Sequence, residues 1–167
     1  SGSRNWLPQI SSVTAAINAT LTRNPGYDLL KDFAPIAKLA VGPTALVVHP
    51  SVPATNLKEL VALSHKDKLN FAVTAIGSAP HLAGVAVEKA TKAQWQYIPY
   101  KGGSQAISDT VAGHAQVLMN GMLATLPHVQ SGKLKVLGVS KATRVPLLAS
   151  VPTIAEQGVK GFESGTW

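Results

Sequence analysis

The chain has 167 residues, which corresponds to one domain or slightly more, and a chain of this length can bury a core without disulfide support. Hydrophobic residues make up 46% and charged residues 14%, a balance that excludes extended disorder. Cysteine is absent, so a disulfide framework, a thiolate metal site and a cysteine nucleophile are excluded, and no apolar run is long enough to cross a membrane.

The formal net charge of +7 comes from 15 basic and 8 acidic residues and suggests an anionic partner. The basic residues are scattered without any run of five, and the arginines among them are Arg4, Arg23 and Arg144. Nucleic-acid-binding proteins concentrate their charge, favour arginine and stack bases on aromatic side chains, whereas aromatic residues make up 5% here. These features argue against a nucleic-acid partner.

In chain order, the first periodic segment is Ile10–Leu21, whose apolar spacing allows a helix although its serines and threonines weaken the pattern. A strong turn signal follows at Asn24-Pro25-Gly26-Tyr27. Strand-like and helix-like patterns then alternate to the end of the chain. The expected strands are Ala45–His49, Leu69–Thr74, Trp95–Pro99, Gln116–Met119 and Lys135–Val139.

Capping signals mark the helices between these strands. Asn56 and Glu59 have the spacing of a capping box before a helix at Leu57–Ser64, and Ser78 opens a helix that continues to about Lys92. The other expected helices are one capped by Ser104 and stopped at Gly113, one at Leu123–Gln130 ended by Gly132, and one opened by a second capping box, Thr153-Ile154-Ala155-Glu156, with Gly158 as its C-cap.

This alternation predicts an α/β fold in which helices flank a mostly parallel sheet. In such folds ligands bind beyond the carboxyl ends of the strands, where helices begin. The loop Thr74–His81 has this position. There Gly77 allows a close backbone approach, Ser78 supplies a hydroxyl, and the start of the next helix offers N–H groups to an anion.

A second loop, Tyr100–Ser104, follows the next strand. Gly102 and Gly103 precede a helix start and form a plausible anion nest, while Lys101 adds a positive charge and Tyr100 a phenol donor. Each loop taken alone is also explained by helix capping. Neither has the spacing of a Walker loop or of a dinucleotide-binding fingerprint.

The sequence gives little support for catalysis or metal binding. Ser78 and His81 are three residues apart, so a nucleophile–base pair is conceivable, but the Gly-x-Ser-x-Gly pattern is absent. The five histidines lack metal-ligand spacing, and the acidic residues are dispersed. We therefore expect no enzyme activity, no metal and no cofactor.

Several ordered segments resemble the receptors of tripartite tricarboxylate transporters, the Bug or TctC-type solute-binding proteins. The similarity extends over about Ile10 to Trp167. The matching segments are Tyr27–Pro35 (Tyr-Asp-Leu-Leu-Lys-Asp-Phe-Ala-Pro), Leu46–Ala54, Gly77–Gly84 (Gly-Ser-Ala-Pro-His-Leu-Ala-Gly), Ile98–Gly103, Leu126–His128 with Ser131–Leu134, and Val151–Gly158 with Gly161–Glu163.

The resemblance implies a three-layer lobe of the type 2 periplasmic-binding-protein fold. It implies a remnant of the first lobe at residues 1–33 and the second, ligand-binding lobe at 34–167. It also implies a periplasmic location, although residues 1–5 do not resemble an export signal, and it implies membrane transporter subunits as partners. The implied solute is a di- or tricarboxylate, an amino acid or an aromatic acid.

The resemblance also implies which residues bind the solute, through loop amides and hydroxyls without an arginine clamp. The implied set is Thr74, Gly77, Ser78, His81, Tyr100, Lys101, Gly102, Gly103, Ser104 and Asn120, with Ser12 and Thr14 from the first lobe. Val73, Ala75 and Ile76 depart from the polar or small residues frequent in the family, which makes this loop more apolar than usual.

Two hypotheses follow. In the first, the chain is part of a non-catalytic receptor for a carboxylated solute. In the second, the single lobe is an interaction module that binds no solute by itself and forms a homodimer through its apolar lobe-facing surface. The dependence of molecular mass on concentration distinguishes them.

Overall fold

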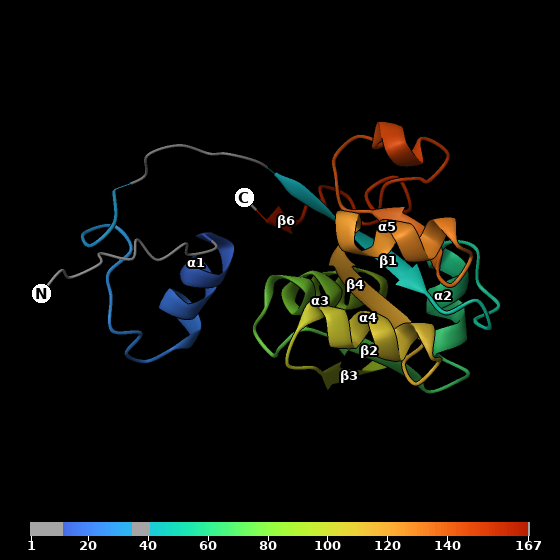
Figure 1. Cartoon of the computed structure of the whole chain (residues 1–167), viewed down its shortest axis with the longest axis horizontal. Coiled ribbons are helices and arrows are strands. Elements are labelled where there is room, and N and C mark those ends of the chain that lie inside the picture. Colours follow the sequence, from blue (N-terminus) through green and yellow to red (C-terminus); the bar gives the residue numbers. More distant parts are fainter. Residues whose placement is uncertain (1–11, 35–40, 167) are drawn as a thin grey trace, which may run out of the picture.

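The computed structural model describes residues 12–34 and 41–166, and its centre is a sheet with helices on both faces (Figure 1). The strands are β1 (Gly42–Val48), β2 (Leu69–Val73), β3 (Trp95–Pro99), β4 (Val117–Gly121), β5 (Lys135–Val139) and β6 (Gly165–Thr166). The helices are α1 (Ser12–Leu21), α2 (Leu57–Ser64), α3 (Ala79–Thr91), α4 (Gly103–Val111), α5 (Met122–Gln130) and the 3-10 turn η1 (Pro146–Leu148). Within the described residues, none of the helices has the length and apolarity that a bilayer crossing requires.

The sheet has the strand order β3-β2-β4-β1-β5, and β6 pairs with the start of β1. Strands β2 to β5 run in one direction, and β1 runs against them between β4 and β5. The predicted mostly parallel α/β sheet is therefore confirmed, with one reversed strand inside it. Alternation of strands and helices could not reveal this reversal, because a helix can follow a strand whatever the direction of the next strand.

Alternate residues of the strands supply two separate cores, one on each face of the sheet. Leu46 and Phe71 belong to the core beneath α2 and α3, whereas Ala45 and Ala72 belong to the core beneath α4 and α5. Burial of a side chain such as Leu46 contributes about 1.5–3 kcal/mol. The two cores fix α3 and α4 on opposite faces, which positions the starts of both helices at one edge of the sheet.

Most predicted elements occur close to their expected bounds, but the start of α4 does not. Gly102, in extended conformation, is the N-cap of α4, and Ser104 lies in the first helical turn rather than at the cap. The prediction was wrong because glycine also adopts the cap conformation, so the helix begins before the first serine.

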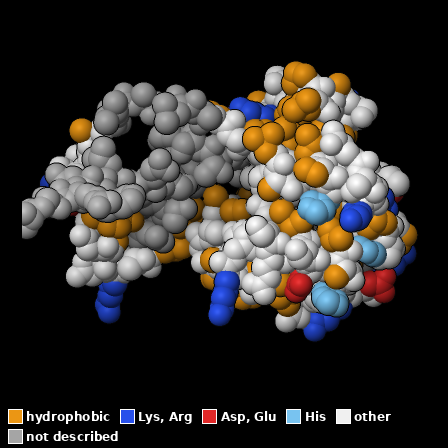
Figure 2. Space-filling model, in the orientation of Figure 1, with side chains coloured by type: hydrophobic (Ala, Val, Ile, Leu, Met, Phe, Trp, Pro, Cys, Tyr) orange, Lys and Arg blue, Asp and Glu red, His pale blue; other side chains and the backbone are white. Residues whose placement is uncertain are grey.

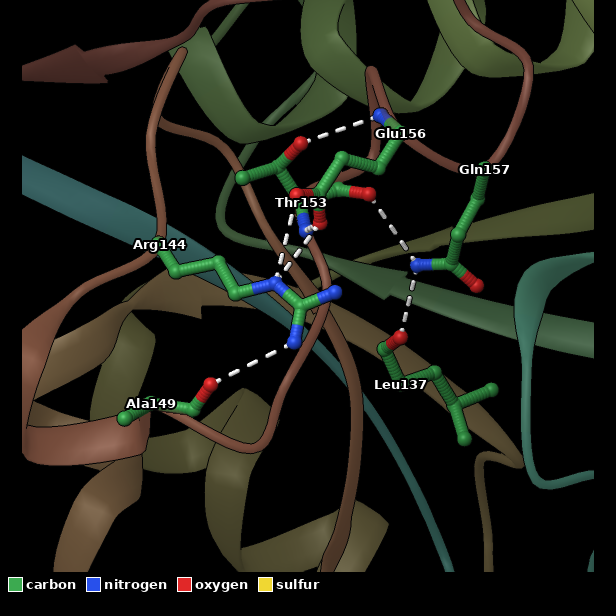
Figure 3. Close-up of polar contacts among 6 residues, drawn as sticks. All are labelled: Leu137, Arg144, Ala149, Thr153, Glu156 and Gln157. Atoms are coloured by element: carbon green, nitrogen blue, oxygen red, sulfur yellow. Dashed lines mark hydrogen bonds and ion pairs between the residues drawn. The ribbon is translucent and has the colours of Figure 1, made fainter.

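The predicted final helix is also absent from the described residues, although its capping box is present (Figure 3). Thr153 Oγ1 accepts from the Glu156 N–H (3.0 Å), and the Glu156 carboxylate accepts from the Thr153 N–H (2.8 Å) and from Arg144 Nε (3.0 Å). Gln157 Nε2 donates to the Leu137 carbonyl (2.8 Å), which holds the segment against β5. The bonds of Glu156 to Arg144 and of Gln157 to Leu137 join distant residues, and they favour a series of turns where local signals indicated a helix.

The N-terminal part of the described chain contains α1, which lies against α3 (Figure 1). The predicted helix at Ile10–Leu21 is confirmed from Ser12 onward, and its first two residues lie outside the described ranges. The proposed division of the chain at residues 33 and 34 stays a prediction.

Candidate functional site

The candidate site is the edge of the sheet at which β2, β3 and β4 end. Parallel pairing aligns Val73 with the last residue of β3, and the Tyr100 N–H donates to the Val73 carbonyl (2.8 Å). The loops Thr74–His81 and Tyr100–Ser104 therefore leave the sheet side by side, and Asn120 lies at the end of the neighbouring strand β4. The structure thus brings together the two loops that the sequence singled out.

Hydrogen bonds within the Thr74–His81 loop hold its own backbone. Ser78 Oγ donates to the Ala75 carbonyl (2.7 Å) and, as the N-cap of α3, accepts from the His81 N–H (3.4 Å). The Ser78 N–H donates to the same carbonyl (3.2 Å), and the Gly77 N–H donates to His81 Nδ1 (3.0 Å). The hydroxyl and the amides of Gly77 and Ser78, which the sequence offered to an anion, are thus engaged inside the loop.

Gly77 also meets a requirement that only glycine satisfies well. Its φ is +81°, and an added Cβ would lie 3.1 Å from Leu21 Cδ1 of α1. Glycine adopts left-handed φ values without the steric cost that a Cβ imposes. The loop is therefore closely packed as well as hydrogen-bonded.

The Tyr100–Ser104 loop has the opposite character. The N-cap of α4 is Gly102, which has no side chain to accept a hydrogen bond from the first turn. Within the described part of the chain, α4 therefore begins without a side-chain cap. An added Cβ at Gly102 would meet no atom within 4 Å, and Lys101 and Ser104 are exposed. The first turn of α4 therefore presents backbone N–H groups and the Ser104 hydroxyl at this edge, and Lys101, just before the N-cap, adds an ammonium group.

Asn120 connects the end of β4 to the start of α4. Its Nδ2 donates to the Gly103 carbonyl (3.3 Å), and its Oδ1 accepts from the Gly121 N–H (2.8 Å). An added Cβ at Gly103 would lie only 2.9 Å from Asn120 Nδ2. Asn120 and Gly103 thus fix the position of the α4 N-terminus relative to the sheet.

The remaining predicted residues are less directly placed at the edge. The Tyr100 ring packs into the core beneath α4, where burial raises the pKa of its phenol and the neighbouring Asp109 carboxylate raises it further. Thr74 is half-buried directly after β2. Ser12 and Thr14 lie in α1, and their side chains are outside what the structure describes.

The geometry offers neither a nucleophile–base pair nor a metal centre at this edge. The Ser78 hydroxyl donates to a carbonyl, and His81 Nδ1 accepts from an amide, so the observed bonds do not direct the hydroxyl proton to the imidazole. Among residues 12–34 and 41–166, no three His, Cys, Asp or Glu residues are arranged to hold a metal ion.

Two features near the site escaped prediction. Thr44, opposite Gly121 at the start of β1, is 2% exposed, and its Oγ1 has no hydrogen-bond partner in the described part of the chain. Tyr97 packs its ring against His81 and bonds its hydroxyl to Glu88. Both are typical strand residues in the sequence, so no local pattern indicated a special environment.

The fold is that of a lobe of the periplasmic-binding-protein type, as three solved structures show. The periplasmic binding protein BugD is 32% identical with a TM-score of 0.86, over 93% of this chain and 52% of that chain. An R. palustris protein solved with adipate is 33% identical with a TM-score of 0.81, over 87% of this chain and 49% of its own. MatC from Rhodopseudomonas palustris, solved with bound malate, is 27% identical with a TM-score of 0.80, over 90% of this chain and 52% of its own.

The chain belongs to the tripartite tricarboxylate transporter family of receptors, whose family model matches residues 9–167. This confirms the resemblance that the sequence motifs indicated, and it places the chain in a family of receptors rather than of enzymes. The chain spans 41–49% of the length of the first curated relatives that it matches.

Proposed function

We propose that this chain supplies one half of the solute site of a periplasmic uptake receptor, and that the solute is a small carboxylate. The observation that carries this proposal is the uncapped start of α4 beside the start of α3, at one edge of the sheet. Helix N-termini attract anions because their first N–H groups lack intrahelical partners and point outward.

The two loops would have different roles in binding. The first turn of α4 supplies N–H groups to a carboxylate, with the Ser104 hydroxyl and the Lys101 ammonium group nearby. The Thr74–His81 loop, whose Gly77 and Ser78 amides are engaged internally, supplies a fixed wall that defines the shape of the site. Relatives solved with adipate and malate, both dicarboxylates, support this substrate class.

The family gives the context of this binding. We propose that the receptor works in the periplasm and delivers its solute to the membrane subunits of a tripartite tricarboxylate-type transporter. The net charge of +7 favours encounter with an anionic solute.

Titration calorimetry and thermal unfolding with malate, adipate and acetate, at constant ionic strength, test the proposal. A solute at 100 times its Kd should stabilise the chain by about 2.7 kcal/mol. We expect saturable binding of a dicarboxylate, weakened about two- to fivefold by Lys101→Ala because an exposed charge interaction contributes about 0.5–1 kcal/mol. Lys133→Ala is the matched control, since Lys133 is equally exposed but precedes β5 at the opposite edge. Equal responses to all three acids, or equal losses in both variants, would contradict a site at the α4 terminus.

A second candidate function is supported by an apolar groove of about 590 Å³ along α3. Ile17 of α1 lies in its lining together with Leu82 and Phe162, and Leu82 is 39% exposed. In Figure 2, hydrophobic side chains (orange) are visible between the N-terminal part of the described chain and the rest of the molecule. A second copy could cover this surface if the lobe acts as an interaction module. Sedimentation analysis over a range of concentrations tests whether the chain forms a homodimer. A constant monomer mass contradicts the homodimer.

A further inference from the structure

His81 has an unusual position for a residue at the start of a helix. It lies in the first turn of α3, and its imidazole turns back so that Nδ1 accepts the Gly77 N–H at 3.0 Å. Gly77 has a φ of +81° and stands directly before the N-cap Ser78. The side chain of His81 thus closes the loop onto the helix that follows it.

A cluster of aromatic residues holds the His81 ring in place. The ring meets Tyr97 edge-on, with centroids 4.8 Å apart and planes at 86°. Tyr97 Oη accepts from Trp95 Nε1 (2.8 Å) and donates to Glu88 Oε2 (2.7 Å), so its own ring is fixed at both sides. Burial raises the pKa of the Tyr97 phenol, which keeps this donor protonated.

The residues of this cluster lie in strands β2 and β3 and in helix α3 rather than in loops. Phe71 of β2 packs against the Tyr97 ring with centroids 5.3 Å apart. An added Cβ at Gly84 of α3 would lie 3.1 Å from Tyr97 Cε1 and 3.2 Å from Phe71 Cζ. Glycine at this position lets α3 approach the aromatic rings, and the approach brings His81 over Tyr97.

We infer that His81 is a positioning residue, whose neutral imidazole holds the Gly77 loop in its observed conformation and whose protonation releases it. If the chain binds a carboxylate as proposed above, its affinity for that carboxylate falls when His81 becomes protonated. This link to binding rests on the proposed function. The role differs from the solute contact that the sequence assigned to His81. The Nδ1 atom of His81 is engaged with an amide of the loop.

The chemistry of imidazole gives the reason. Nδ1 accepts a hydrogen bond only while it carries no proton, so the observed bond requires the neutral ring with its proton on Nε2. In the imidazolium ion both nitrogens are donors, and the Gly77 N–H would face another N–H. Within the described part of the chain, the titratable groups that the contacts place toward the ring are Tyr97 from β3 and, behind it, Glu88 from α3. From α1, the side chain packed against the loop is the uncharged Leu21.

The first experiment needs no solute. In a ¹⁵N-labelled sample of the full chain, the Gly77 amide shift and the His81 ring shifts are followed by NMR as the pH is lowered. We expect both to titrate with one common midpoint. His81→Asn places an amide oxygen near the position of Nδ1, so the Gly77 shift should stay near its neutral-pH value and lose its pH dependence. His81→Gln, whose amide reaches the position of Nε2 instead, should shift Gly77 at every pH. His65→Asn, a change of an exposed histidine after α2, is the matched control and should titrate like the wild type.

The second experiment measures the affinity for malate and adipate over the same pH range at constant ionic strength. Below the midpoint found by NMR, and at pH values where the dicarboxylates stay ionised, the affinity should fall by up to about tenfold for each pH unit in the wild type and in His65→Asn, but not in His81→Asn. His81→Gln should bind weakly at every pH.

The two experiments separate two kinds of failure. A Gly77 amide that does not follow His81 overturns the positioning role, whether or not the chain binds a solute. Affinity that is independent of His81 protonation overturns the link to binding. If Gly77 follows His81 and yet the wild type binds no dicarboxylate at any pH, the positioning role stands and the proposed function fails.

Discussion

The two loops at the edge of the sheet differ in how they treat the N-terminal hydrogen-bonding groups of the helices that follow them. Before α3, Ser78 caps the helix and His81 closes the loop, so side chains of the loop occupy its hydrogen-bonding groups. Before α4, the N-cap is Gly102, which makes no side-chain cap. The first helix start is therefore capped by side chains of its loop, whereas the second has no side-chain cap from Gly102.

This difference shows that two glycine- and serine-rich loops of similar composition need not have similar hydrogen bonding. In the function that we propose, the loop before α3 provides shape and rigidity, and the loop before α4 provides donors. Substitutions in either loop, or in the strand β1 nearby, test this difference, and the expected effect on stability decreases from Gly77 to Gly102.

Gly77→Val should destabilise the chain by about 2–3 kcal/mol, because a β-branched residue at a left-handed φ is strained and its side chain meets Leu21. Urea unfolding measures the loss. The matched control is Gly102→Ala, where the backbone is extended and the space is open, and where we expect a change within about 1 kcal/mol. Equal losses in the two variants would remove the proposed difference in rigidity.

Ser78→Ala should cost about 1–2 kcal/mol, since it removes both the cap of α3 and the bond to the Ala75 carbonyl. Ser104→Ala, in the first turn of α4 but not at its cap, should change the free energy of unfolding by no more than about 0.5 kcal/mol. Thermal unfolding of both variants checks the contrast. A larger loss in Ser104→Ala would mean that Ser104 has a structural role at α4.

Thr44→Val should stabilise the chain by about 1 kcal/mol, because it replaces a buried hydroxyl, which lacks a partner among residues 12–34 and 41–166, with a methyl group of similar size. The unpartnered group at Thr44 thus differs from the N–H groups at the start of α4, which solvent or a solute can reach. Thr125→Val is the control: its hydroxyl is equally buried but donates to the Met122 carbonyl (3.1 Å), so this variant should be less stable than the wild type. A loss of stability in Thr44→Val would indicate that Thr44 bonds to a buried water.

Gly102→Ser has the smallest expected effect on stability, a gain of a few tenths of a kcal/mol, because it adds a side-chain cap to α4. The new hydroxyl would occupy an N–H group that we assign to the solute, so the affinity for a dicarboxylate should fall several-fold. Calorimetry and urea unfolding on the same sample show whether the two quantities move in opposite directions. Unchanged affinity together with increased stability would mean that the α4 terminus is not the anion site.

Local patterns in the sequence determined most of the secondary structure and the place of both loops. Periodicity located β1 to β5, and the capping residues Asn56 and Ser78 marked the starts of α2 and α3. These features depend on interactions between residues close in the chain, which a single sequence displays. The same local motifs were sufficient to indicate the family.

Tertiary structure decided the direction of β1, the loss of the predicted helix after Thr153, and which loop remains open. Each depends on contacts between residues far apart in the sequence: β1 with β5, Gln157 with Leu137, and Phe71 and Tyr97 with the helix that carries His81. The residues next to His81 in the sequence do not indicate whether its side chain faces a solute or the loop. It accepts the Gly77 amide in the folded chain, where α3 packs against Phe71 of β2 and Tyr97 of β3 and the ring lies edge-on to Tyr97, and such packing is a property of the folded chain as a whole.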